Sequence, residues 1–414
     1  MENENISRRR FIGQSAKVAA GVSLGLAGAP AILKSQSPSE IINVGMIGTG
    51  DRGVWEAYIL QSVPEVRLIA CCDILPSHLK NGLEQADSNA KGYEDYRKLL
   101  ENEDLDAVII ATPLHLHYKM AIDALDAGLH VFGEKTMTYD IPQANKLKTK
   151  VEDSKKIFMV GYQLRSNPLL QKVKIMINEG VCGTLTHVRC NYHRNGDWRR
   201  EVSDPSLEKL INWRMYREFS GGLMAELCSH HIDITNWMLG EHPQKVTGFG
   251  GIDYWKDGRE TYDNVNTVYE YPGGKKAIFT SITTNAHYGV ELQFMGTHGT
   301  IEIRSEEGQE AMYYPELARK THETESDTTD VDAVSSATQK AWSSGKGEPI
   351  QVPDRPKDDH ETTGLAFKHF AKSIKENTLP NANVFTGRDA AIAVHLGNRA
   401  MRNGTVEFWS SEKE

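Results

Sequence analysis

Apolar positions follow two different patterns along the chain. Between residues 41 and 161, short continuous apolar runs alternate with segments in which apolar residues recur at helical spacing. The runs cover residues 41–47, 66–72, 107–111, 129–132 and 157–161, and the helical segments cover 54–60, 93–100, 115–127 and 142–151. Repeated strand–helix units of this kind predict an α/β domain with a parallel sheet that helices cover on both faces.

From about Thr184 the pattern changes to longer alternating runs, which are typical of strands with one buried face. These runs cover residues 185–193, 246–254, 264–271, 277–284, 291–294 and 300–304, with glycine turns at 273–274 and 296–299. They predict a C-terminal α+β domain built on a large, mainly antiparallel sheet. Later elements are expected to be a mobile Ser/Thr/Asp/Gly-rich loop within 315–350, helices at 361–375 and 388–402, and a short strand at 406–409.

The first apolar run breaks into a turn that contains Gly48, Gly50 and Gly53. Glycines at this spacing let the turn close tightly, let a pyrophosphate approach the backbone, and let the following helix pack on its strand. The motif is weak by itself, and a plain glycine turn is the alternative. However, the second apolar run ends at Asp73, twenty residues after Gly53, where a carboxylate can bind a ribose hydroxyl. The sequence therefore predicts a dinucleotide site.

Composition limits the possible partners. The formal net charge of −9 gives no basic face for DNA or RNA, so nucleic acid is not expected as a partner. The cysteines show neither a CxxC motif nor metal-type spacing, which predicts buried free thiols. They are Cys71, Cys72, Cys182, Cys190 and Cys228.

The N-terminus has the features of an export signal. The motif Ser7-Arg8-Arg9-Arg10-Phe11 precedes a mildly apolar, Ala/Gly-rich run at 18–29, and together they look like a twin-arginine leader of residues 1–35. The apolar run is too short for an ordinary membrane span, so we expect a periplasmic protein without stable membrane insertion after export. A disordered basic N-terminus is the alternative, and the cleavage position stays open.

Lys135 follows a buried strand, in the segment Gly133-Glu134-Lys135. Ligands of open α/β sheets lie beyond the carboxyl ends of the strands, so this lysine is well placed to act on a reacting oxygen. A salt bridge with Glu134 is the structural alternative.

A second group of polar residues follows a pair of glycines. On a regular helix, Glu226, His230, Asp233 and Trp237 fall on one stripe. A carboxylate one turn before a histidine can fix its tautomer and raise its basicity, as a general base requires. The alternatives are a structural stripe and a metal site. We expect no metal, because adjacent histidines such as His230 and His231 point about 100° apart on a helix.

Between these two sites, polar side chains are interleaved with tryptophan at 191–200 and 212–214. Such a segment can line a sugar pocket, where rings stack on C–H faces and polar groups pair with hydroxyls, but a solvated loop is the alternative. The candidate substrate-binding residues are Tyr162, Arg165, His193, Asp197, Trp198, Trp213, His231 and Asp233.

Six motifs then occur in one order: GTGDRG, CCD, TPLHLH, GEK, GYQLRSNP and GGLMAELCSHHID. With the closing pattern HFAKSIKENTLPNANVFTGRDAAIAV, they make the chain from about Ile42 to Trp409 resemble the Gfo/Idh/MocA oxidoreductases, the group of glucose-fructose oxidoreductase and inositol dehydrogenases. The resemblance implies a Rossmann domain at 40–162 that binds NAD or NADP. It also implies a substrate domain at 163–414 that mediates a homo-oligomer, either a dimer or a tetramer.

The resemblance further implies a lysine that acts beside an acid and a histidine, which here are Lys135, Glu226 and His230. This chain has Thr136 where relatives have proline, and Glu226 where they have aspartate. Because no basic residue follows Asp73, its carboxylate would repel a 2′-phosphate, which favours NAD over NADP. Positions that touch the cofactor in relatives match Asp51, Arg52, Asp73, Thr112, Pro113, His117, Glu134 and Gln163 here.

Together these features predict an exported NAD-dependent dehydrogenase that acts on a hydroxyl of a sugar, glycoside or cyclitol. An exported branch of the same family cleaves glycosides by transient oxidation and elimination, but it lacks the lysine after the glutamate, so Lys135 favours net oxidoreduction. Glycoside 3-oxidation that supplies a separate lyase and a non-catalytic sensor are further alternatives. Because free NAD should be scarce outside the cytoplasm, we expect a tightly retained dinucleotide.

Overall fold

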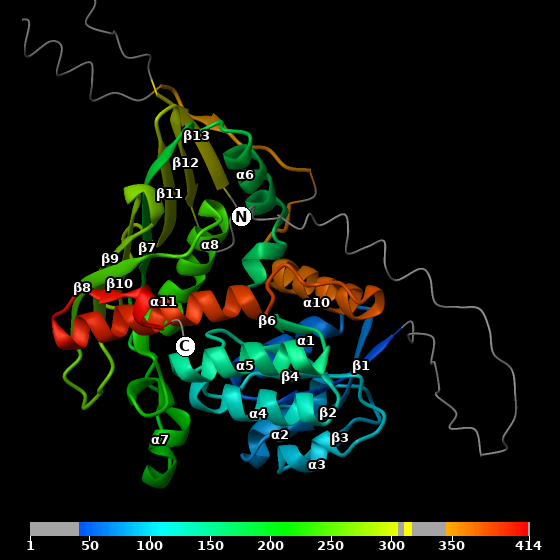
Figure 1. The fold of residues 1–414 in the computed structure, drawn as a ribbon. Coiled ribbons are helices and arrows are strands. Elements are labelled where there is room, and N and C mark those ends of the chain that lie inside the picture. The colour runs from blue at the N-terminus through cyan, green and yellow to red at the C-terminus, as the bar shows by residue number, and fades with distance from the viewer. Residues whose placement is uncertain (1–40, 305–309, 317–344, 354, 413–414) are drawn as a thin grey trace, which may run out of the picture. The chain divides into compact units, whose positions relative to one another are not determined.

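The computed structural model describes residues 41–304, 310–316, 345–353 and 355–412. A parallel sheet and a larger mixed sheet follow each other along the chain (Figure 1). The predicted leader falls outside the described residues, as does most of the predicted loop at 315–350. At the described end of that loop, Glu348–Pro349 form the short strand β14, which pairs with β13 (Glu310–Pro315).

The first sheet has six strands in the order β3-β2-β1-β4-β5-β6. All neighbouring pairs are parallel, as predicted, and the apolar runs predicted five of the six strands. The strands are β1 (Ile42–Ile47), β2 (Val66–Cys72), β3 (Lys91–Tyr93), β4 (Ala107–Ile110), β5 (His130–Gly133) and β6 (Phe158–Val160). Strand β3 was not predicted, because this short edge strand is largely exposed and so carries no apolar run. Since β1 lies between β2 and β4, the chain winds in opposite directions from it, and this opens a crevice at the strand ends.

Helices cover this sheet on both faces. They are α1 (Asp51–Leu60), α2 (Pro76–Gln85), α3 (Tyr96–Leu100), α4 (Leu114–Asp126) and α5 (Ile141–Ser154). Helix α2 was not predicted, because its apolar stripe is short and only partly buried, with Leu79 and Leu83 packed on the core.

The second sheet has nine strands, in the order β14-β13-β12-β11-β7-β10-β9-β8-β15. All neighbouring pairs are antiparallel except β7 with β10, so the sheet is mixed but mostly antiparallel, as predicted. The remaining strands are β7 (Leu185–His193), β8 (Lys245–Gly251), β9 (Asn264–Glu270), β10 (Lys276–Ile282), β11 (Val290–Gly296), β12 (Gly299–Arg304) and β15 (Glu407–Phe408). All five cysteines are free and buried, and Cys182 lies just before β7.

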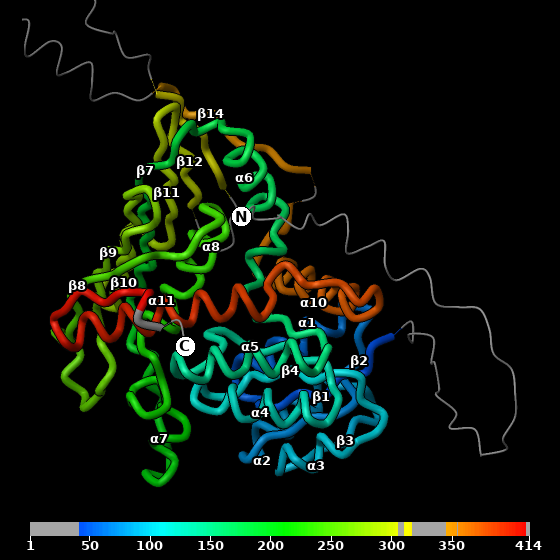
Figure 2. The backbone as a smooth tube through the Cα atoms, viewed as in Figure 1, coloured from blue at the N-terminus to red at the C-terminus, as the bar shows by residue number. Residues whose placement is uncertain are grey.

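The last two long helices pack on the first domain, and α11 also contacts the second sheet. Helix α11 (Val384–Asn403), red in Figure 2, contacts α5, the strand β8 and the helix α8 (Ser229–Leu239). Helix α10 (Asp359–Glu376) packs on α1, and its Phe367 and Phe370 rings lie 4.9 and 5.7 Å from the Phe132 ring on β5. The C-terminal segment therefore completes the core of the N-terminal domain.

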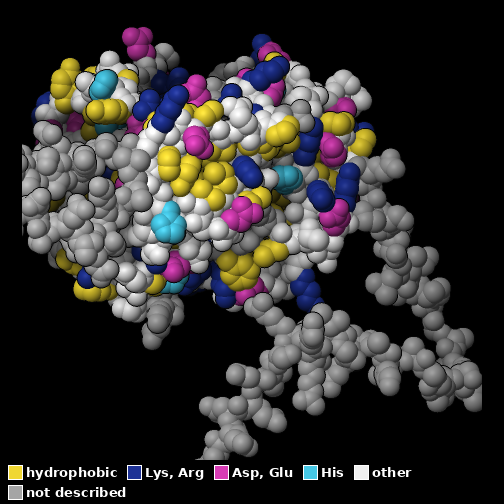
Figure 3. Space-filling model, turned by 90° about the horizontal axis from the view of Figure 1, so that it is seen from above, with side chains coloured by type: hydrophobic (Ala, Val, Ile, Leu, Met, Phe, Trp, Pro, Cys, Tyr) yellow, Lys and Arg dark blue, Asp and Glu magenta, His cyan; other side chains and the backbone are white. Residues whose placement is uncertain are grey.

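On the face drawn in Figure 3, acidic and basic side chains are interspersed with apolar ones. Among the described residues, no helix is long and apolar enough to cross a membrane.

Candidate active site

A cavity of about 1260 Å³ runs from the glycine turn to the helix that carries His230. The strand ends of the parallel sheet form one wall, and residues between 192 and 219 of the second domain form another. Every predicted cofactor-binding residue except Gly53 lines it, namely Gly48, Gly50, Asp51, Arg52, Asp73, Thr112, Pro113, His117, Glu134 and Gln163. A cavity of this length and lining fits a dinucleotide with a substrate beside it.

The glycine turn is closed by backbone contacts that exclude side chains. Gly48 has a φ of +92°, and a Cβ on Gly53 would lie 2.0 Å from the Gly48 carbonyl oxygen. No side chain caps the start of α1, which leaves its first N–H groups available to an anion. These features fit the pyrophosphate of a dinucleotide.

Replacing Gly53 by alanine should therefore force helix α1 away from the turn. We expect Gly53→Ala to melt at a lower temperature and to retain far less dinucleotide, measured on the denatured protein. Gly50→Ala is the matched folding control, because the nearest heavy atom to its added Cβ is 3.7 Å away on His78. Wild-type melting and dinucleotide content in Gly53→Ala would contradict this account of the turn.

Asp73 is held ionised at the end of β2. Its carboxylate accepts hydrogen bonds from the backbone N–H groups of Thr49 (2.8 Å) and Leu75 (2.9 Å). Burial alone would raise the pKa of Asp73, but these bonds and the neighbouring His78 outweigh it and lower that pKa. A fixed negative charge here suits ribose hydroxyls and disfavours a 2′-phosphate.

Glu134 is paired with Arg52 and not with the side chain of Lys135. Arg52 Nε donates to Glu134 Oε1 over 2.9 Å, and the Lys135 backbone N–H donates to Oε2 over 3.0 Å. Burial would raise the pKa of Glu134, but the Arg52 guanidinium outweighs it and lowers that pKa. The salt bridge between Glu134 and Lys135 is thereby ruled out, and the lysine side chain is left to act elsewhere.

The Lys135 ammonium group reaches the second domain. Its Nζ donates to the Glu226 carbonyl oxygen over 2.9 Å and lies 3.9 Å from the Glu226 carboxylate. Thr136, which stands where relatives have proline, donates its hydroxyl to the Ala225 carbonyl oxygen. Two consecutive residues at the end of β5 therefore hold the segment before His230 against the parallel sheet.

Glu226 is buried between two cations. Arg214 Nε donates to its Oε2 over 2.8 Å, opposite the Lys135 ammonium. Burial alone would raise the pKa of Glu226, but Lys135 and Arg214 more than offset it, so that pKa is lowered and the carboxylate is ionised.

The expected helical stripe is wrong in one respect. Met224–Cys228 form a π-helical turn before α8 begins at Ser229, so Glu226 and His230 are not spaced as on a regular α-helix. Of the described residues, Lys135 and Arg214 contact the Glu226 carboxylate, and no hydrogen bond joins it to His230. Single π-turns within helices are frequent at functional sites. Glu226 thus positions Lys135 and does not orient the histidine.

His230 lines the cavity as a neutral imidazole. Burial, and then the nearby Lys135 ammonium, place the pKa of His230 well below its usual value of 6.5. Its Nδ1 is buried and has no hydrogen-bond partner, so Nε2 is the nitrogen that remains for a substrate hydroxyl. A neutral imidazole beside an ammonium group can accept a proton from an alcohol whose oxygen the ammonium stabilises.

Of the predicted substrate-binding residues, only Trp198 and Trp213 line the cavity. Arg165 and Asp233 bind each other in a buried pair, with Nε–Oδ2 at 2.8 Å and Nη2–Oδ1 at 2.9 Å. His193 bonds to the His287 carbonyl oxygen. The candidates that the structure places outside the cavity, and so does not bring to a ligand there, are Tyr162, Arg165, His193, Asp197, His231 and Asp233.

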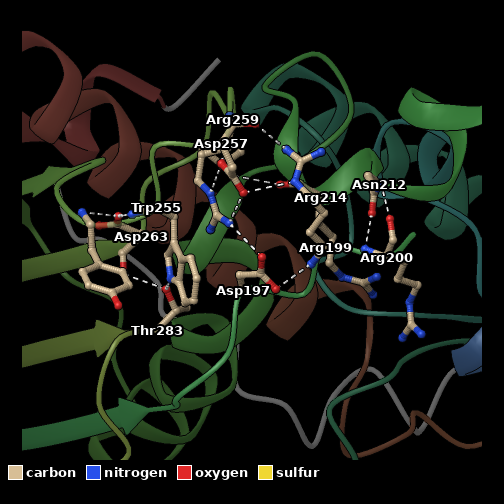
Figure 4. Close-up of polar contacts among 12 residues, drawn as sticks. Asp197, Arg199, Arg200, Asn212, Arg214, Trp255, Asp257, Arg259, Asp263 and Thr283 are labelled. Carbon is tan, nitrogen blue, oxygen red and sulfur yellow. Dashed lines mark hydrogen bonds and ion pairs between the residues drawn. The ribbon is translucent and has the colours of Figure 1, made fainter. Parts of the chain in front are cut away.

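Asp197 belongs to a network that fixes the segment over the cavity. Figure 4 shows its carboxylate pointing toward Arg259, 3.8 Å away, while Arg259 and Arg199 both bind Asp257. Arg200, which follows Arg199, is held through its backbone. Its N–H donates to Asn212 Oδ1, and its carbonyl oxygen accepts from Asn212 Nδ2. These contacts hold the segment that carries Trp198 and Trp213 in one conformation.

His231 has a structural role that a stability measurement can detect. Its ring packs on Tyr192, and burial lowers its pKa from 6.5 to about 3. Below pH 6.5 this imidazole takes up a proton in the unfolded chain but stays neutral in the folded chain until the pH approaches 3. Protonation therefore favours unfolding, so the unfolding free energy is highest above pH 6.5 and falls as the pH drops toward 3. At about pH 5 this histidine should cost roughly 2 kcal/mol of unfolding free energy.

Replacing His231 by phenylalanine should remove that acid sensitivity. Chemical unfolding at several pH values is the measurement, and Michaelis constants should stay at the wild-type level. An unchanged pH dependence of stability, or a raised KM, would contradict a purely structural His231.

Sequence reasoning missed three arginines of the second domain that line the cavity: Arg194, Arg200 and Arg214. All three lie in the polar, aromatic segments that were predicted to line a pocket. Composition could not separate them from solvated residues, since only the packing shows which side chains turn inward. Arg200 reaches Asp51 at the start of α1 over 2.5 Å, so it connects the second domain to the glycine turn.

Comparison with protein families agrees with this architecture. A model described as "Oxidoreductase family, NAD-binding Rossmann fold" matches residues 42–162, and a "GFO/IDH/MocA C-terminal domain" model matches residues 170–302. The two models describe parts of one family and together cover more than half of the chain. The chain belongs to the Gfo/Idh/MocA family. Its N-terminal domain is an NAD-binding Rossmann domain of an oxidoreductase, as the glycine turn and Asp73 predicted.

Relatives of this family member include sugar and inositol dehydrogenases. The scyllo-inositol 2-dehydrogenase (NAD(+)) of Bacillus subtilis is 24% identical over 88% of this chain and 95% of its own length. The 2,7-anhydro-N-acetylneuraminate hydratase of Mediterraneibacter gnavus is 29% identical over 51% of this chain and 52% of its own length. Levoglucosan dehydrogenase in complex with NADH has the same fold, with a TM-score of 0.72 at 19% identity over 89% of this chain and 98% of that one.

Among the residues that the structure describes, no group of three or more His, Cys, Asp or Glu side chains could hold a metal ion.

Proposed function

We propose that this protein is an exported dehydrogenase that oxidises a hydroxyl group of a sugar, glycoside or cyclitol and keeps its NAD bound throughout. The observation that carries the proposal is the convergence of Lys135 and His230 at one end of a cavity whose other end is the glycine turn. The activities of relatives, which include scyllo-inositol 2-dehydrogenase and levoglucosan dehydrogenase, support this substrate class.

The chain's own residues supply the acid–base part of the reaction. A bound NAD would supply the acceptor for the hydride of the carbinol carbon. His230 Nε2 takes the hydroxyl proton, and the Lys135 ammonium hydrogen-bonds to the oxygen on which negative charge develops. Glu226, held by Arg214, keeps the ammonium group at that oxygen and compensates part of its charge. Because the cofactor stays bound, a second substrate has to take the hydride back. The same groups can serve this reverse step, in which a keto-sugar is reduced and the retained cofactor is oxidised again.

The depressed pKa of His230 sets the pH range of activity. Because the imidazole must be neutral to accept a proton, activity should persist until the pH falls below the usual histidine value of 6.5. The acid limb of kcat/KM is therefore expected below pH 6.5, and His230→Asn should lose most activity at every pH. An acid limb above pH 6.5 would contradict His230 as the base.

Retention of the cofactor rests on the segment that crosses the cavity. Arg200 reaches Asp51 at the glycine turn, and the network around Arg199 and Asn212 fixes the same segment. A dinucleotide in the cavity would lie between this segment and the parallel sheet, so both parts would contact it. The twin-arginine motif at Ser7–Phe11 suits such a protein, because folded chains can carry a cofactor through that export route.

Mass spectrometry of the denatured, exported protein tests retention directly. We expect NAD, oxidised or reduced, in close to one copy per chain after long dialysis. Loss of the dinucleotide on dialysis, with activity restored only by added NAD, would overturn retention while leaving the dehydrogenase assignment intact.

The second candidate is an NAD-dependent glycosidase that acts by transient oxidation and elimination. Incubation of the purified protein with chromogenic hexosides separates the two. A keto-sugar formed without release of the aglycone supports the dehydrogenase. Release of the aglycone by the protein alone would support the glycosidase instead.

A further inference from the structure

The substrate end of the cavity carries more positive than negative charge. Lys135, Arg194 and Arg214 all line it there, and Glu226 is the carboxylate that two of them share. Of the other carboxylates that line the cavity, Glu134 is bound by Arg52, and Asp359 lies near this pair and accepts a hydrogen bond from Gln163. This local excess of cations contrasts with the net charge of −9 of the whole chain.

Arg194 is the cation for which the described residues offer no carboxylate partner. It follows strand β7 directly, where its backbone N–H donates to the Ile282 carbonyl oxygen over 2.9 Å. Its guanidinium lies 5.9 Å from the centre of the Tyr192 ring and lines the cavity. The Arg214 guanidinium lines the same cavity. Partial burial, and then the positive charge of Arg214, lower the pKa of Arg194.

Arg214 also has hydrogen-bond donors that no residue described in the structure uses. Its Nε is used by Glu226, and its guanidinium stacks 4.3 Å from the centre of the Trp213 ring. Among the described residues, no hydrogen bond occupies its two terminal amino groups. Two like charges placed together in a cavity repel each other unless an anion lies between them.

We propose that Arg194 and Arg214 bind an anionic group of the substrate, so that the enzyme acts on an acidic sugar such as a uronate or a sugar phosphate. Arginine is the residue best suited to this task, because its planar fork matches carboxylate and phosphate oxygens in pairs. The pyrophosphate of the cofactor is not the anion that this pair would bind. Arg214 binds Glu226 at the end of the cavity that holds Lys135, whereas the glycine turn lies at the other end, beside Arg200. This inference rests on the proposed function and specifies its substrate class.

The test compares matched sugars on the enzyme with its bound cofactor. Glucuronate, glucose 6-phosphate, glucose and the methyl ester of glucuronate are offered separately. The change in nicotinamide absorbance is measured with each sugar alone, and the Michaelis constants are measured with a keto-sugar added as the second substrate that reoxidises the bound cofactor. We expect at least one anionic sugar to have a KM about tenfold to a hundredfold below that of its neutral counterpart. Preference for glucuronate over its ester assigns a carboxylate, and preference for glucose 6-phosphate assigns a phosphate.

Arg194→Met should raise the KM for the anionic sugar by a similar factor with little change in kcat, and Arg194→Lys should recover part of the loss. Arg189→Met is the matched control, because Arg189 lies on the same strand β7 but outside the cavity. Two results would overturn the anion site while the dehydrogenase assignment stands: equal turnover of charged and neutral sugars, or an equal rise in KM for both kinds of sugar in Arg194→Met. If no sugar changes the redox state of the bound cofactor, the proposed function itself fails.

Discussion

Replacing Lys135 by methionine should reduce turnover by about 10²–10⁴-fold while the protein keeps its dinucleotide. Methionine preserves the length of the side chain but removes the ammonium group that stabilises the reacting oxygen. The cofactor should remain, because Lys135 Nζ bonds to the Glu226 carbonyl oxygen and not to the glycine turn. Turnover is measured under saturating sugar, and the dinucleotide is measured by mass spectrometry of the denatured variant.

Lys148→Met is the control for this substitution. Lys148 lies on α5 and pairs with Glu152 on the surface, so its loss should leave both turnover and cofactor content unchanged. Undiminished turnover in Lys135→Met would remove Lys135 from the reaction. Loss of the dinucleotide in that variant would show instead that the lysine holds the cofactor.

Breaking the buried pair of Arg165 and Asp233 should have the largest effect on stability. Both side chains are almost fully buried, and two parallel hydrogen bonds join them. Asp233→Asn keeps the shape but leaves the guanidinium without a counter-ion, which should lower the unfolding free energy by about 3–5 kcal/mol. Equilibrium unfolding in denaturant gives this number.

The exposed pair of Lys148 and Glu152 provides the comparison, since Glu152→Gln should change stability by less than about 1 kcal/mol. If Asp233→Asn behaves like this surface variant and instead raises the KM for sugar, then Asp233 faces the substrate after all. That result would also contradict the position of Arg165 outside the cavity.

The parallel sheet could be predicted because its strands are short apolar runs that end in polar residues. Burial on both faces leaves that pattern in β1, β2 and β4, and the glycine turn and Asp73 fall at their ends. Short elements with little buried apolar surface leave a weaker pattern, which is why α2 and β3 were not found. The contribution of α10 to the core beside β5 was invisible for another reason, since it depends on a contact between distant parts of the chain.

The active site was predicted in its residue types but not in its pairings. Helical spacing suggested that Glu226 faces His230, and the π-turn at Met224–Cys228 changes that relation. Glu226 pairs with Lys135, which is far from it in the sequence, and with Arg214, which lies in an irregular segment. Asp233 likewise fits a polar stripe, but its partner Arg165 could be identified only from the fold.

Deuterium transfer tests the central claim that the cavity oxidises a carbinol carbon with a bound dinucleotide. The exported protein is given glucuronate or glucose with deuterium on every carbon that bears a hydroxyl group, and the dinucleotide is then extracted from the denatured protein and weighed. Our account predicts deuterium in the dinucleotide from the wild-type protein and almost none from Lys135→Met. A keto-sugar formed by the wild-type protein with no deuterium in its dinucleotide would contradict it.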